Sequence, residues 1–139
     1  MTMQHPRVDS DIITASFSML FAGGESDQTV TTTLRYNVFE PFQVTATLSL
    51  PDAPSVQWVL ARELLREGLV IPSGLGDITV RPTPHGLLIG LRSPGGRAVL
   101  LAPTEPIAEF VQAVYRAVPD GAEGDFFSIE AELERLADI

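Results

Sequence analysis

Residues 61–82 read ARELLREGLVIPSGLGDITVRP and join a short charged helix to a glycine-punctuated loop and then to a strand. The helix is predicted over residues 61–67, where apolar residues recur at helical spacing, with Gly68 as its C′ residue. The loop over residues 72–77 contains two glycines, which is typical of a tight turn. Alternation resumes in residues 77–81 and predicts a strand. This stretch therefore predicts a passage, through one helix, from one group of strands to another.

The segments around this stretch alternate between apolar and polar residues, which is the pattern of half-buried strands. The six clearest predicted strands are residues 13–21, 30–36, 42–50, 77–81, 87–92 and 97–102. In the third of them we expect Phe42 to begin the inward-facing set, which Val44 and Ala46 continue. Such regular alternation is typical of antiparallel strands with one solvated face.

Residues 56–61 fit two structures. Trp58, Val59 and Leu60 suit a buried strand, whereas the apolar spacing that follows them suits a helix. We favour a strand over residues 55–60 that leads into the helix at residue 61. A single helix from Val56 remains the alternative.

After residue 103 the period of the sequence changes to that of a helix. Apolar residues fall on one face at Ile107, Phe110, Val111, Val114 and Val118. Thr104 is the expected N-cap, Pro119 ends the pattern, and a last helix is predicted from Ile129. The element order is strands then helix, twice over, which predicts one α+β domain.

Composition limits the classes of protein that the chain can represent. It has 139 residues, of which 45% are hydrophobic and 19% are charged, as expected for one globular domain. We expect that domain to occupy residues 12–139, after a flexible segment over residues 1–11. There is no cysteine, which excludes disulfides, thiolate metal sites and cysteine nucleophiles. The polar beginning and the lack of a long apolar run predict a cytoplasmic protein.

No motif in the sequence indicates catalysis or a cofactor. His5 and His85 lack neighbouring ligands at metal-binding spacing, and the Gly-x-Ser-x-Gly motif of serine hydrolases is missing. Gly74 and Gly76 begin a pattern that lacks its third glycine, because Thr79 stands there, and a strand follows in place of a helix. We therefore predict no catalytic residue, no metal and no cofactor.

Charge argues against nucleic acid as a partner. The net charge is −9, whereas binding to a phosphate backbone is driven by clustered basic residues. We therefore expect no meaningful binding of DNA or RNA.

The exposed charged turn and loop around residues 62–77 form the candidate partner surface. Its residues are Arg62, Glu63, Arg66, Ser73 and Asp77. Exposed loops and charged turns carry recognition more often than core strands do. The alternative interpretation is a solvated helix face of little energetic weight, with Ser73 as an ordinary turn residue.

Several short motifs, in order and at matching spacing, resemble the SsgA-like family of actinobacterial proteins. They are Leu34-Arg35-Tyr36, Glu40-Pro41-Phe42-x-Val44, Trp58 with residues 61–69, residues 72–82, Ser93-Pro94 with residues 100–103, and the closing helix. Within this family the short single-domain form is most similar to the SsgB-type members. The resemblance implies two antiparallel β-sheets with helices, in a topology similar to that of the Whirly single-stranded nucleic-acid-binding proteins.

The resemblance also implies a function. Members of this family are regulators of sporulation-specific cell division, without enzymatic activity, and help to localise the FtsZ division ring at septum sites. The implied partners are FtsZ, a second SsgA-like protein and further copies of the chain in a homotrimer, with the membrane reached only indirectly. A single-stranded nucleic-acid-binding regulator of the same fold is the alternative function.

Overall fold

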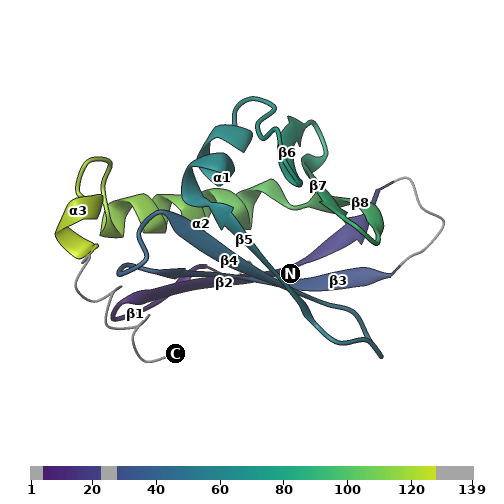
Figure 1. The fold of residues 1–139 in the computed structure, drawn as a ribbon, viewed down its shortest axis with the longest axis horizontal. Helices are drawn as coiled ribbons and strands as arrows, with labels where there is room; N and C mark the ends of the chain where they lie inside the picture. The colour runs from purple at the N-terminus through teal and green to yellow at the C-terminus, as the bar shows by residue number, and fades with distance from the viewer. Residues whose placement is uncertain (1–4, 23–27, 128–139) are drawn as a thin grey trace.

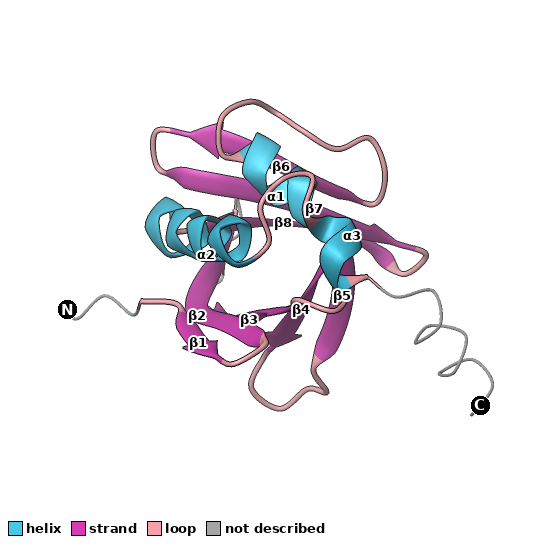
Figure 2. Cartoon of the chain, turned by 90° about the vertical axis from the view of Figure 1, so that its left-hand side faces the viewer, coloured by secondary structure: helices cyan, strands magenta, loops and turns pink. Residues whose placement is uncertain are grey.

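The computed structural model describes residues 5–22 and 28–127, and within them an antiparallel β-sheet of eight strands is curled into a half-barrel (Figures 1 and 2). The strands are β1 (Arg7–Asp9), β2 (Ile12–Phe21), β3 (Thr29–Asn37), β4 (Gln43–Ser49), β5 (Val56–Ala61), β6 (Ile78–Thr83), β7 (Gly86–Ser93) and β8 (Gly96–Ala102). The helices are α1 (Arg62–Gly68), α2 (Thr104–Ala117) and α3 (Glu123–Phe126). The α+β class expected from the sequence is confirmed.

The sheet has two arms, the strands β5-β4-β3-β2 and the strands β8-β7-β6, and a short pairing between β2 and β8, which we call the seam, joins them. Its strand order is β5-β4-β3-β2-β8-β7-β6, and β1 pairs with β2 off this path. At the seam, β2 and β8 share only the pairs Leu20↔Leu101 and Phe21↔Leu100, and the N–H of Ala22 donates to the carbonyl of Val99 at 2.9 Å. The expectation of two separate sheets is therefore corrected to one continuous sheet. Alternation predicts the strands, but it does not reveal that β2 and β8, far apart in sequence, pair at their ends.

Helix α2 supplies the centre of the hydrophobic core. It lies between the two arms of the sheet (Figure 2), and its residues Ile107, Phe110, Val111 and Val114 are buried, as the helical pattern predicted. Helix α1 contacts β5, β6 and α2, so it closes the side of the core where the two ends of the sheet approach each other. The position of α1 is thereby determined by burial of apolar surface.

The strand predictions are confirmed, with a few changes at the ends of elements. Residues 56–61 form a strand that passes directly into α1, so the alternative of a single helix is wrong. Phe42 is 57% exposed, because β4 begins only at Gln43 and Phe42 belongs to the preceding turn. Strand β1 and helix α3 were not predicted, because each is too short to show a period. The helix expected from Ile129 lies outside the described residues.

Two predicted helix boundaries are corrected. Gly68 is the last residue of α1 and not a C′ residue. It packs so closely on β6 that a Cβ atom there would lie 2.4 Å from Cγ1 of Val80, so the glycine serves close approach and not a left-handed turn. Thr104 is the first residue of α2, and Pro103 occupies the N-cap position without a side-chain hydrogen bond.

Candidate functional site

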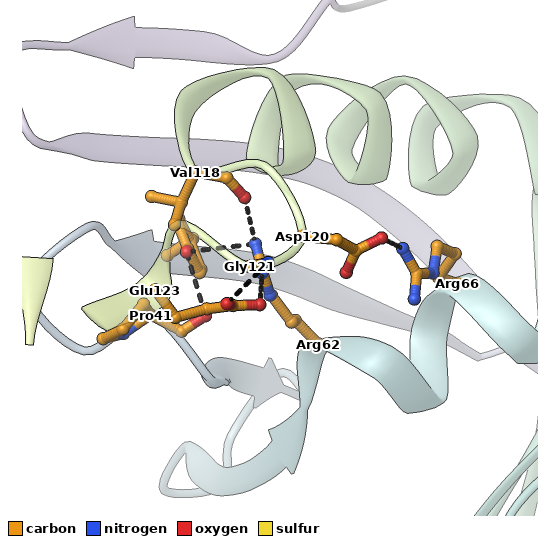
Figure 3. A network of polar contacts seen from close by, with 8 residues as sticks. Pro41, Arg62, Arg66, Val118, Asp120, Gly121 and Glu123 are labelled. Carbon is orange, nitrogen blue, oxygen red and sulfur yellow. Dashed lines mark hydrogen bonds and ion pairs between the residues drawn. The ribbon is translucent and has the colours of Figure 1, made fainter. Parts of the chain in front are cut away.

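Arg62 is the centre of a polar network that ties α1 to the segment following α2 (Figure 3). The backbone N–H of Arg62 donates to the carbonyl of Phe42 and so continues the β4–β5 ladder, and the helix starts at this same residue. Its side chain is only 3% exposed and continues the buried face of β5 that includes Leu60, two residues earlier. Its Nη1 donates to the carbonyl of Val118 at 2.6 Å, and its Nη2 donates to Oε1 of Glu123 at 2.6 Å.

Two tyrosines complete the surroundings of this guanidinium group. The hydroxyl of Tyr36 lies 3.5 Å from Nη1 of Arg62 and donates to the carbonyl of Pro41 at 2.9 Å. The ring centroid of Tyr115 lies 4.0 Å from Cζ of Arg62 and 4.2 Å from Cζ of Arg66, within the range of cation–π attraction. Burial raises the pKa of both tyrosine hydroxyls, although Arg62 opposes the shift. Both tyrosines are therefore neutral near neutral pH.

Glu123 balances the buried positive charge. Its Oε2 accepts a hydrogen bond from the backbone N–H of Gly121 at 2.9 Å, while Oε1 faces Arg62. Its pKa is lowered, first by its own backbone N–H and then by the hydrogen bonds from Arg62 and Gly121. The guanidinium group thus has an anionic partner and a hydrogen-bond acceptor for each of its two terminal nitrogens, which is the arrangement that makes a buried charge tolerable.

Glu123 gives the folded protein a specific dependence on pH. A carboxyl group whose pKa is lowered in the folded state stabilises that state when the pH is above its ordinary pKa of 4.5. This stabilisation is lost as the pH falls through the folded-state pKa. We expect the variant Glu123→Gln to be less stable than the wild type at about pH 7, with the difference shrinking towards about pH 3. Urea unfolding followed across this range checks the prediction. A difference that is independent of pH would contradict it.

The structure separates the five residues predicted as a partner surface. Arg62 is buried, which corrects its placement in that surface, since its partners in the interior were not visible in the sequence. Glu63 and Asp77 are exposed, and Asp77 lies 3.7 Å from Nε of Arg92. Arg66 is part-exposed and pairs with Asp120, as Figure 3 shows. Ser73 is half-buried and exchanges two backbone hydrogen bonds with Val80.

An open groove of about 640 Å³ lies between β5, α1 and the loop before β6. Its apolar lining includes Trp58, Leu64 and Ile78. The charged residues that line it are acidic, namely Glu63, Glu67 and Asp77. Two members of the predicted partner surface, Glu63 and Asp77, thus face one groove. With the loop between α1 and β6, the exposed parts of α1 define what we call the α1 surface: Glu63, Arg66, Glu67, Ser73 and Asp77.

Sequence reasoning missed the residues that surround Arg62. Tyr36 and Glu123 lie 26 and 61 residues from Arg62 along the chain, and Tyr115 lies on α2. No local spacing therefore connects them to Arg62. The one available signal was the presence of two arginines at (i, i+4) spacing on a short helix, which places both on one face. That signal does not tell whether the face is buried.

Two further kinds of feature, a metal-binding cluster and a membrane-spanning helix, are absent from the described part of the chain. Residues 5–22 and 28–127 contain no group of three or more His, Asp or Glu side chains placed to hold a metal ion. Within the same residues, no helix has the length and apolar character required to span a membrane.

Comparison with known proteins identifies one family. The family model described as "Streptomyces sporulation and cell division protein, SsgA" matches residues 30–123. The "Sporulation-specific cell division protein SsgB" of Streptomyces coelicolor is 39% identical over 121 residues, which is 84% of this chain and 88% of that protein. The protein of the same name from Frankia casuarinae is 32% identical over 98% of this chain and 95% of its own length.

Solved structures show the same likeness. An SsgA-like sporulation-specific cell division protein from Thermobifida fusca superposes with a TM-score of 0.77 at 29% identity, over 95% of this chain and all of that one. A second structure, described in connection with SsgB mutations that correlate with longitudinal cell division during sporulation of S. coelicolor, also gives a TM-score of 0.77. It is 34% identical and covers 91% of this chain and 100% of its own.

Proposed function

Because the chain belongs to the SsgA family of sporulation and cell division proteins, we propose that it is a non-enzymatic regulator of sporulation-specific cell division. In this proposal it acts at the septum as an adaptor that helps to localise the FtsZ ring, together with a second SsgA-like protein. The observation that carries the proposal is the likeness to proteins named SsgB over nearly the whole chain. It agrees with the resemblance to SsgB-type members noted in the sequence.

The surface supports an adaptor more than an enzyme. The buried ion pair of Arg62 and Glu123 is used to hold α1 against the segment after α2, and not to face a ligand. The groove beside α1 is open to solvent on one side and is lined by carboxylates without a paired acid and base in an enclosed cleft. Contacts made through the α1 surface are the simplest use of this geometry.

The first test is deletion of the gene in its host, with fluorescent FtsZ as the readout. We expect loss of regular septal ladders and of spores, because the ring would lack its positional cue. Normal ladders and normal spores in the deletion strain would end the proposal.

Complementation then tests the α1 surface. We expect the variant Glu63→Lys to fail to restore ladders, whereas Glu105→Lys, the same charge reversal at an exposed position in α2, restores them. Both variants should fold, because both side chains lie in solvent. If both variants restore the ladders equally, the α1 surface is not the contact region, but the proposed function is not contradicted.

The homotrimer and the nucleic-acid alternative also remain proposals. We propose a trimer on the family resemblance alone, and light scattering of the purified protein measures its mass. A Whirly-like topology would favour single-stranded nucleic acid as a ligand, but the net charge of −9 opposes it. Fluorescence anisotropy with a single-stranded oligonucleotide at physiological salt separates the two functions, since micromolar binding with a steep salt dependence belongs only to the alternative.

A further inference from the structure

Strand β5 forms one end of the sheet, where it pairs with β4, and among the described residues no strand pairs with its side away from β4. Because the N–H of Arg62 donates to Phe42, alternate pairs along this antiparallel ladder exchange hydrogen bonds, and these include Leu60 with Val44. The N–H and C=O groups of Gln57 and Val59 and the N–H of Ala61 therefore point away from β4, whereas the C=O of Ala61, the N-cap residue of α1, accepts the first hydrogen bond of that helix. These three residues define what we call the β5 edge.

The opposite end of the sheet is protected in a way that the β5 edge is not. On β6, the outward N–H and C=O of Val80 bond to Ser73 at 3.0 and 2.8 Å, and Pro82 has no N–H to offer. Strand β5 reads VQWVLA, without proline and without a charge. Folded proteins usually blunt such edges with charges, proline or a covering segment. An edge left open in this way is suited to receive another strand.

The groove beside the β5 edge indicates what kind of strand fits. Val59 is 57% exposed and Leu75, on the other side of the groove, is fully exposed. The charges along the groove are all negative, from Glu63, Glu67 and Asp77. An incoming segment therefore gains from apolar side chains and from lysine or arginine near its ends. A second copy of the chain that pairs through its own β5 is a poor occupant, because that strand, VQWVLA, brings no lysine or arginine to the acidic groove.

We propose that the β5 edge binds an extended, basic-and-apolar segment of a partner protein by strand addition. The partner's backbone extends the sheet beyond β5, and the acidic groove selects its basic side chains. This inference rests on the proposed adaptor function, because it states how the adaptor holds its partner.

The test uses purified full-length protein and two fluorescently labelled peptides. One peptide, KTVTVTVK, has the alternation of a strand and a lysine at each end, and the other, ETVTVTVE, differs only in its terminal charges. By anisotropy we expect micromolar binding of the lysine peptide and at least roughly tenfold weaker binding of the glutamate peptide. Replacing both Glu63 and Glu67 by glutamine should weaken binding of the lysine peptide and reduce its dependence on salt.

A matched pair of variants at Val59 tests the edge itself. Val59→Pro removes an N–H that points away from β4, so it costs no hydrogen bond of the ladder, and we expect binding to fall at least roughly tenfold. Val59→Thr keeps the N–H and should bind within about twofold of the wild type. If Val59→Pro does not fold, the glutamine double variant, whose changes lie on the exposed helix face, tests the same site.

Three binding results would overturn the inference: no binding of the lysine peptide, equal binding of both peptides, or binding unaffected by folded Val59→Pro. A change of molecular mass in Val59→Pro would assign the edge to a second copy and overturn it too. These binding assays are independent of the cellular role of the protein. If the peptide does not bind but the deletion strain lacks septal ladders, only the proposed docking site is wrong. If the deletion strain forms normal ladders, the proposed function is wrong.

Discussion

The variant Arg62→Ala is expected to lose about 3–5 kcal/mol of its free energy of unfolding, the range for removing one partner of a buried ion pair. The guanidinium group is 3% exposed and donates to Val118 and Glu123, both at 2.6 Å. Without it, the Val118 carbonyl loses this donor, the Glu123 carboxylate keeps backbone N–H donors but loses its cationic partner, and the Tyr115 ring loses a cation at 4.0 Å. Urea unfolding at neutral pH measures the change.

Two further variants make this prediction specific. Arg62→Lys should recover only part of the stability, because an ammonium group cannot direct separate N–H groups at Val118 and Glu123 as the planar guanidinium does. Arg66→Ala should cost less than about 1 kcal/mol, since its ion pair with Asp120 lies near the surface. Comparable losses for Arg62→Ala and Arg66→Ala would contradict the interpretation that burial makes Arg62 important.

The second large effect is expected at the centre of α2. Phe110 is fully buried, and Phe110→Ala should cost about 3–5 kcal/mol through lost burial and the cavity left behind. Gln112→Ala is the matched control, because Gln112 is exposed on the same helix and its substitution should change stability by at most about 0.5 kcal/mol. Urea unfolding measures both, and near-ultraviolet circular dichroism of Trp58 and the tyrosines reports on packing. A loss below about 1 kcal/mol for Phe110→Ala would show that α2 is not the centre of the core.

The sequence predicted those parts of the fold that depend on near neighbours. Residues 13–21 and 30–36 alternate because β2 and β3 each have one buried face, and that period is visible without knowing the partner strand. The spacing of Ile107, Phe110 and Val114 likewise revealed the buried face of α2. The SsgA-like motifs then connected these elements to a family, which the comparisons confirm.

What could not be predicted depends on residues that are distant in sequence. The seam between β2 and β8 makes one sheet out of two expected ones, and no local pattern marks it. Arg62 was expected in a surface cluster, because a charged residue on a short helix is usually solvated. Its burial depends on Tyr115 and Glu123, which only the folded chain brings to it. Glu63 and Asp77, in contrast, lie in solvent, and their role as contacts stays a prediction.

The long-range bonds of Arg62 also have a consequence for the order of events in folding. Its partners Val118 and Glu123 lie 56 and 61 residues after Arg62 in the sequence, so this contact closes a large loop. Closing that loop costs conformational entropy until α2 has packed into the core. We therefore expect the network to form after the folding transition state. Substitution of Arg62 should accelerate unfolding and leave the refolding rate nearly unchanged, so that stopped-flow kinetics would place its φ-value near zero. With such a φ-value, Arg62 would determine how long the native state persists, and not how quickly it is reached.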